Sequence, residues 1–107
     1  MTRPATAFKV LTAQQWADFE RERVFRGAPV DIEDGYIHLS TAAQLDATIA
    51  KYFAGEADLI IAEVDLARLG GSVRWEAARG GDLFPHIYAE LPIEAVVSIR
   101  QRSNGAE

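Results

Sequence analysis

The chain contains no cysteine and has a deficit of cationic side chains, and both shortages limit what it can do. Without thiols it forms no disulfide, carries no thiolate nucleophile and offers no sulfur ligand to a metal. Its 11 lysines and arginines are outnumbered by 16 acidic residues, which gives a formal net charge of −5. An acidic domain lacks the electrostatic footprint of a protein that binds duplex nucleic acid or an anionic membrane. We therefore expect neither of these partners.

Long apolar runs, internal repeats and linker-like stretches are also missing. No segment approaches the roughly 20 apolar residues that a membrane-spanning helix needs. Residues 1–7 lack the apolar run of a signal peptide, so we expect a cytoplasmic protein. A chain of 107 residues fits one domain, a monomer or weak homodimer. Residues 8–101 are expected to form its ordered core and residues 103–107 a flexible tail.

Two pairs of residues have the spacing of a helix capping box. Thr12 precedes Gln15 by three residues, and Thr41 precedes Gln44 by the same interval. In such a pair the hydroxyl and the amide each accept a hydrogen bond from the other residue's backbone N–H. The spacing predicts two helices in the N-terminal half of the chain. Residues 21–32 contain a glycine and a proline and are expected to form a loop.

Short segments of alternating or apolar residues predict the strands. The predicted strands are residues 7–11, 36–39, 59–66, 73–78, 84–90 and 95–99. The fourth and fifth flank Arg-Gly-Gly-Asp at 79–82, whose glycines accept the positive φ of a hairpin turn. Short strands with two helices in the first half predict an α+β fold with a mostly antiparallel sheet.

The first of only two histidines lies in the most informative segment, 34–41. Because side chains alternate along a strand, Tyr36, His38 and Ser40 share one face, and Ile37 and Leu39 the other. The histidine is therefore predicted to stand on a strand beside an aromatic ring and to point away from the apolar side.

The second histidine repeats this arrangement. Phe84, His86 and Tyr88 share a face, and Ile87 points the other way. Two such strands predict the lining of a pocket for a small-molecule ligand, in which the histidines act as acid or base groups or as hydrogen-bond partners. The alternative is that each histidine is half-buried in its strand and bonds a nearby backbone group.

Other candidate site residues have an ordinary structural reading beside the functional one. Ser40 and Thr41 precede a predicted helix, where free N–H groups bind anions or where hydroxyls simply cap the helix. Glu76 is either a catalytic carboxylate or half of a surface ion pair. Glu63 lies on the core strand, at its wet end or as a buried carboxylate.

A metal site is the weakest of the chemical readings. The two histidines with Glu63, Glu76 or Asp34 supply three ligands, but no close-spaced ligand motif occurs, so no metal is predicted. The sequence also lacks the glycine-rich nucleotide motifs and the Gly-x-Ser-x-Gly elbow of serine hydrolases.

Several motifs together resemble a known bacterial family. They are 34–41 (Asp-Gly-Tyr-Ile-His-Leu-Ser-Thr), Gln44, 51–53 (Lys-Tyr-Phe), 58–59 (Asp-Leu), 63–65 (Glu-Val-Asp), 75–76 (Trp-Glu) and 83–88 (Leu-Phe-Pro-His-Ile-Tyr). Over residues 8–97 the chain resembles domain of unknown function 952, which is grouped with the ADP-ribosyltransferase-like superfamily. The resemblance implies that fold.

Residues 37–40 also resemble a stretch of the RNA 2′-phosphotransferases, which use NAD. This resemblance implies that His38 contacts the NAD ribose and that Glu76 or Glu63 holds a ribose hydroxyl. Lys9 stands on the strand where those enzymes carry an arginine, and their nucleic-acid-binding domain has no counterpart here.

Three functions remain open from the sequence. The first is an enzyme that binds NAD or an ADP-ribose compound and cleaves or transfers it. There His38 and His86 position the ribose, and Tyr88 or Phe84 stacks on the nicotinamide. The second is a non-enzymatic metabolite-binding module on a degenerate version of the fold. The third is a metal-dependent enzyme.

Overall fold

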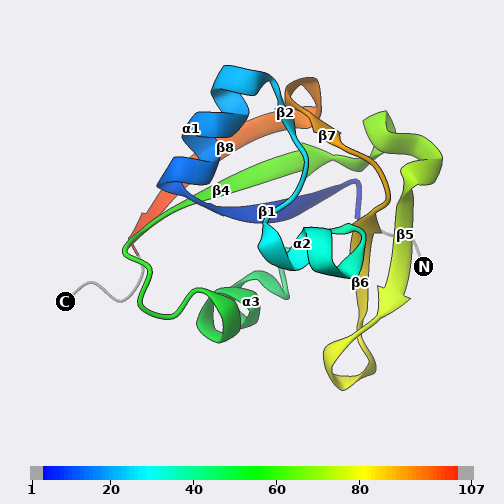
Figure 1. The fold of residues 1–107 in the computed structure, drawn as a ribbon. Coiled ribbons are helices and arrows are strands. Elements are labelled where there is room, and N and C mark those ends of the chain that lie inside the picture. Colours follow the sequence, from blue (N-terminus) through cyan, green and yellow to red (C-terminus); the bar gives the residue numbers. More distant parts are fainter. Residues whose placement is uncertain (1–3, 104–107) are drawn as a thin grey trace.

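The computed structural model describes residues 4–103, which form an α+β fold (Figure 1). The helices are α1 (Ala13–Glu22), α2 (Pro29–Asp34) and α3 (Leu45–Tyr52). The strands are β1 (Thr6–Thr12), β2 (Val24–Phe25), β3 (Ile37–His38), β4 (Asp58–Asp65), β5 (Val73–Ala77), β6 (Leu83–Ile87), β7 (Leu91–Pro92) and β8 (Val96–Ser103). Short 3₁₀ segments span Leu66–Ser72, Arg79–Gly81 and Ile93–Ala95. All strand pairs within residues 4–103 are antiparallel, so the predicted α+β class with antiparallel strands is confirmed.

The longest strands form one sheet in the order β1-β4-β8. The central strand β4 is buried from Leu59 to Ala62 because both of its faces are covered. On one face, Ile60 and Ala62 join the core beneath α1, with Phe19 of that helix. On the other face, Leu59 and Ile61 pack with Ile49 of α3. An apolar strand covered on both sides explains the near-continuous apolar run in the sequence.

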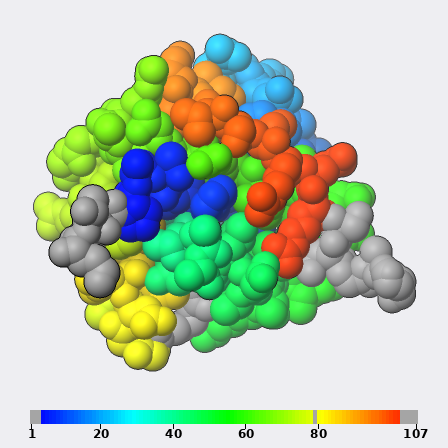
Figure 2. All heavy atoms as spheres, turned by 180° about the vertical axis from the view of Figure 1, so that it is seen from behind, coloured from blue at the N-terminus to red at the C-terminus, as the bar shows by residue number. Residues whose placement is uncertain are grey.

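A second sheet, ordered β3-β6-β5, carries both histidines. It joins the first sheet through a bridge in which Phe8 N donates to Ser40 O at 2.8 Å and Ser40 N donates to Phe8 O at 2.9 Å. Seen from behind, the blue N-terminal strand and the green residues that follow β3 lie side by side (Figure 2). The bridge therefore sets the histidine sheet against the edge of β1, with α3 nearby.

The expectation of a loop over residues 21–32 is wrong. The segment contains β2, which pairs with β7, and most of α2. Pro29 occupies the first helical position, where its fixed φ suits the helix and its missing N–H costs nothing. The carboxylate of Asp31 accepts the backbone N–H of Ala28 at 2.8 Å and so caps the helix. Residues 4–103 therefore contain three α-helices where two were predicted.

The capping boxes are both formed, but the second does not start a helix directly. Thr12 and Gln15 exchange their two hydrogen bonds at the start of α1. Thr41 and Gln44 exchange theirs across a turn, and α3 begins only at Leu45.

The predicted flexible tail over residues 103–107 is also wrong in part. Ser103 is the last residue of β8 and pairs with Asp58, so the predicted tail does not begin there. Residues 104–107 lie outside the described part of the chain. None of the helices within residues 4–103 is long and apolar enough to cross a membrane.

Candidate ligand pocket

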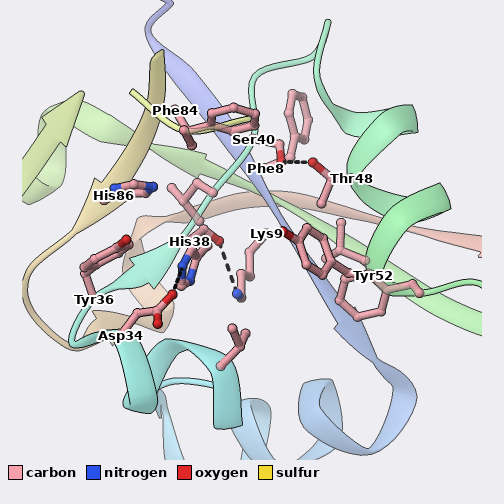
Figure 3. A pocket seen from close by; sticks show the side chains of 15 residues that line it. Phe8, Lys9, Asp34, Tyr36, His38, Ser40, Thr48, Tyr52, Phe84 and His86 are labelled. Carbon is pink, nitrogen blue, oxygen red and sulfur yellow. Dashed lines mark hydrogen bonds and ion pairs between the residues drawn. The ribbon is translucent and has the colours of Figure 1, made fainter. Parts of the chain in front are cut away.

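A pocket of about 420 Å³ opens between the edge of β1, the histidine sheet and α3 (Figure 3). Its aromatic wall consists of Phe8, Tyr36, Tyr52, Phe53 and Phe84. Both histidines line the same space. A concave site with aromatic walls and a few polar groups is the usual form of a small-molecule site.

The two histidines are direct cross-strand neighbours. His38 on β3 is in register with His86 on β6, and their ring centroids lie 5.3 Å apart. Tyr36 stacks on His86 with a centroid distance of 4.1 Å and an interplanar angle of 25°. The alternation of side chains along both strands therefore produces the predicted lining of histidine and aromatic residues.

Both ring nitrogens of His38 lie against carboxylates. Nδ1 is 2.6 Å from Oδ1 of Asp31, and Nε2 is 2.9 Å from Oδ2 of Asp34. Ionised carboxylates only accept hydrogen bonds, so each nitrogen must carry a proton to bond its partner. Asp31 and Asp34 lie one helical turn apart on α2, and Gly35 in the left-handed region (φ 91°) ends that helix just before β3.

Asp31 is the centre of a buried polar cluster. Besides His38 Nδ1 and Ala28 N, its carboxylate accepts Lys9 Nζ at 2.9 Å and the backbone N–H of His38 at 3.1 Å. Burial alone would raise the pKa of Asp31, but the hydrogen bond with His38, the charge of Lys9 and the Ala28 N–H outweigh it. The pKa falls from 3.8 to about 2. The group is therefore ionised at neutral pH.

Lys9 is the cation of this cluster. It is 5% exposed, and its Nζ also donates to the backbone oxygen of His38 at 3.1 Å. Burial lowers the pKa of Lys9, while the charge of Asp31 acts in the opposite direction. Lys9 lines the pocket, but its charge is already balanced by Asp31.

His86 has a carboxylate partner of its own on the outer strand β5. Nδ1 of His86 lies 2.7 Å from Oε1 of Glu76, and the hydroxyl of Tyr88 donates to the same oxygen at 2.8 Å. The hydrogen bonds from His86 and Tyr88 lower the pKa of Glu76, and the bond to Glu76 raises the pKa of Tyr88. Glu76 is thus a partner of a histidine, and not half of a simple surface ion pair with Arg74.

The structure brings most of the predicted site residues together. Lys9, Tyr36, His38, Ser40, Phe84 and His86 line the pocket. Glu76 and Tyr88 stand behind His86, outside the lining. Tyr88 contacts the pocket through Tyr36, with ring centroids 5.2 Å apart. The prediction that Tyr88 stacks on a ligand has no support from this position.

Of the two readings of Ser40 and Thr41, the anion site finds no support in the structure. Ser40 N is used in the bridge to Phe8, and Thr41 N donates to Gln44 Oε1. The hydroxyl of Ser40 is paired with that of Thr48 at 2.8 Å. The backbone N–H groups of Ser40 and Thr41 are therefore already bonded, and Thr41 is not part of the pocket lining.

Glu63 lies elsewhere, on β4. It accepts hydrogen bonds from Thr6 at 2.8 Å and Ser98 at 2.9 Å, one from each neighbouring strand. Within residues 4–103, no group of three histidine, aspartate or glutamate side chains is placed to hold one metal ion. The metal-dependent reading therefore gains no support.

Sequence reasoning missed Asp31 altogether and considered Asp34 only as a metal ligand. One signal was available for Asp31: a proline two residues before an acidic residue is typical of the first turn of a helix. Asp34 lies four residues before His38, next to the glycine of the turn, and its pocket position follows from that geometry.

The comparison with known families identifies a class and no activity. Residues 10–99 match the family described as a protein of unknown function, DUF952, so the chain belongs to that family. It is similar to protein CC0527 from Caulobacter crescentus, at 38% identity over 90% of this chain and 84% of that chain, with a TM-score of 0.87 for the crystal structure. The solution NMR structure of CC0527 gives a TM-score of 0.83, 36% identity and coverage of 94% and 86%. None of the curated proteins matches the sequence.

Proposed function

We propose that the pocket binds a small ligand made of a flat ring and a ribose, with NAD and ADP-ribose compounds as the first candidates. An ADP-ribosyltransferase-like fold is part of this proposal and rests on the sequence resemblance. The observation that carries the proposal is the position of His38 and His86 side by side in one pocket, with Tyr36 stacked on His86.

The aromatic wall suits the ring of such a ligand, and the two histidines suit its hydroxyls. Aromatic faces stack on flat rings, and imidazole nitrogens donate to or accept from ribose oxygens. A diphosphate fits less well. Among the described side chains that line the pocket, Lys9 is the one lysine or arginine, and it is paired with Asp31. A ribose end of the ligand, and not its diphosphate, is therefore the part expected inside.

A second candidate is a binding module without turnover. Glu76 favours it, because this carboxylate lies outside the lining and is hydrogen-bonded to His86 and Tyr88. It is thus not directed at a bound ribose, as the carboxylate of an ADP-ribosyl-transfer site would be.

Calorimetric titration with NAD and, separately, with ADP-ribose tests the proposal. The His38→Ala/His86→Ala double variant removes both imidazoles and should abolish saturable binding. Glu94→Gln is a matched control, because Glu94 is exposed and is not part of the pocket lining. It should bind as the wild type does. Absence of heat at millimolar concentrations of both ligands would contradict the proposal.

A nicotinamide-release assay then separates the two candidates. An NAD-cleaving enzyme should release nicotinamide, and His38→Ala should stop the release. Binding without release in the wild type would establish the binding module.

A further inference from the structure

The two histidines share one construction. In each, a carboxylate holds Nδ1, with Asp31 at 2.6 Å from His38 and Glu76 at 2.7 Å from His86. A carboxylate at Nδ1 fixes the orientation of the ring and stabilises its protonated form during proton transfer. Because the two nitrogens lie on different sides of the ring, Nε2 of each histidine is left for other partners. His86 places it toward the pocket, since Glu76 stands outside the lining.

The two Nε2 atoms nevertheless differ. Nε2 of His38 faces Oδ2 of Asp34 and therefore carries a proton when Asp34 is ionised. Among the described side chains, none hydrogen-bonds Nε2 of His86, while its Nδ1 donates to Glu76. A neutral imidazole with its proton on Nδ1 has an acceptor at Nε2. One pocket thus holds a proton donor and a proton acceptor on adjacent strands (Figure 3).

The surroundings favour a neutral, polar group in the pocket, with any charged part of the substrate outside it. The described lining has no unpaired lysine or arginine, and the carboxylate of Asp34 stands in the pocket. An anionic group placed beside this carboxylate would be repelled. Aromatic faces such as Phe84 and Tyr36 pack against the apolar face of a sugar ring, and the polar groups reach its hydroxyls.

We propose that His38 and His86 act as a general acid and a general base that open and close a cyclic hemiacetal, and so interconvert the anomers of a reducing sugar. The terminal ribose of ADP-ribose is such a hemiacetal, and choosing it as the substrate rests on the ligand proposed above. A free pentose tests the chemistry independently of that choice.

The step balances without a cofactor. Nε2 of His86 accepts the proton of the anomeric hydroxyl, and the C1–O1 bond becomes a carbonyl. In the complex the ring oxygen of the sugar replaces Asp34 as the hydrogen-bond partner of Nε2 of His38. The bond between C1 and this oxygen breaks, and the oxygen accepts the Nε2 proton of His38. The product is the open-chain aldehyde. Reclosure on the other face of the carbonyl reverses both proton transfers and yields the other anomer.

Magnetisation-transfer NMR on the anomeric protons measures this exchange directly. The probes are D-ribose and ADP-ribose at neutral pH, in a buffer without imidazole, with protein that carries no histidine tag, because free imidazole also catalyses the reaction. We expect wild type and Glu94→Gln to accelerate exchange equally. His86→Gln and His38→Gln should each lower the accelerated rate by about 100-fold, the usual contribution of a general acid or base.

Circular dichroism of the same variants shows that they remain folded. Glu76→Gln is a second measurement, because the amide can still accept from Nδ1 but no longer stabilises a positive charge on His86. It should lower kcat and leave KM unchanged, whereas a purely structural role would change both.

The outcomes separate this inference from the proposed function. ADP-ribose that binds in calorimetry without faster exchange would overturn the inference and leave the proposed function in place. Faster exchange of free ribose without binding of NAD or ADP-ribose would support the inference and contradict the proposed ligands. Full exchange activity in His86→Gln, or no acceleration of either probe, would also overturn the inference.

Discussion

The two histidines each form a hydrogen bond between Nδ1 and a carboxylate, but the two carboxylates lie in opposite surroundings. At one end Asp31 holds His38 from inside the protein, with a side chain that is 1% exposed. At the other end the carboxylate of Glu76, whose side chain is 37% exposed, holds the buried ring of His86. The Asp31 carboxylate accepts four donors, counting Lys9 Nζ, Ala28 N, His38 N and His38 Nδ1, and Glu76 accepts two.

The comparison indicates that the Asp31–His38 hydrogen bond serves both the stability of the fold and the pocket. The Glu76–His86 hydrogen bond serves the pocket alone. A buried carboxylate with a buried lysine cannot be removed without leaving a charge in the interior. A half-exposed carboxylate can be replaced with little cost, because water compensates. Substitutions at the two ends should therefore separate folding from ligand chemistry.

Asp31→Ala should have the largest effect. It leaves the ammonium of Lys9 buried without its partner and removes the acceptor of Ala28 N, so the free energy of unfolding should fall by about 3–5 kcal/mol. Urea denaturation measures the loss. Asp34→Ala, on the same helix and at the same histidine, is the matched control and should cost less than about 1 kcal/mol. Equal losses in the two variants would contradict a special role for the buried carboxylate.

The second-largest effect should be the loss of folding stability as the pH becomes acidic. Because the pKa of Asp31 is about 2 in the folded protein against 3.8 ordinarily, its contribution is complete above about pH 4 and is lost as the pH falls toward 2. The difference corresponds to about 2 kcal/mol. Unfolding curves between pH 5 and pH 2 measure it. Asp31→Asn should lack this part of the dependence, and an unchanged slope in that variant would show that other carboxylates carry it.

Glu76→Gln should change stability much less and still affect the site. Its Tm should stay within about 3 °C of the wild type, since substitutions near the surface cost little. The accelerated anomeric exchange should slow by about tenfold while the affinity for ADP-ribose stays unchanged, because His86 loses a charge-assisted hydrogen bond that stabilises its protonated form. Thermal unfolding, exchange NMR and calorimetry on the same sample give the three quantities. A large drop in Tm with an unchanged exchange rate would reverse the assignment of roles.

Tyr88→Phe should give the smallest effect, a change in the pKa of the Glu76 carboxyl group alone. The hydroxyl of Tyr88 donates to Oε1 of Glu76, so its removal should raise the pKa of Glu76 toward the ordinary value. The pKa should remain below that value, because the hydrogen bond from His86 persists. Carbon-13 NMR of the glutamate carboxyl groups follows the titration. A pKa that stays unchanged would mean that the tyrosine does not bond Glu76 in solution.

The local parts of the site could be predicted from the sequence. Alternation along two strands placed Tyr36, His38, Phe84 and His86 in one lining, because the period of a strand depends only on the backbone. The same alternation puts Trp75 on the face of β5 opposite Glu76, where it packs against the core.

The parts that depend on burial could not be predicted. Asp31 becomes the centre of a buried polar cluster because Lys9, on the buried face of a distant strand, reaches it. No local pattern records that contact. The proline and glycine of residues 21–32 suggested a loop, whereas the proline begins a helix whose first turn is closed by Asp31 itself.

The register of β3 against β6 has a consequence for how the pocket comes into being. Asp31 and His38 lie close in sequence, and Glu76 and His86 belong to one hairpin, so each half of the site can form from local contacts early in folding. The pocket itself exists only after Ile37 and His38 pair with Ile87 and His86, which is a non-local step. A ligand that contacts both histidines therefore links two parts of the chain that form independently. Binding of such a ligand should slow amide hydrogen exchange in the paired strands β3 and β6 more than in the rest of the protein.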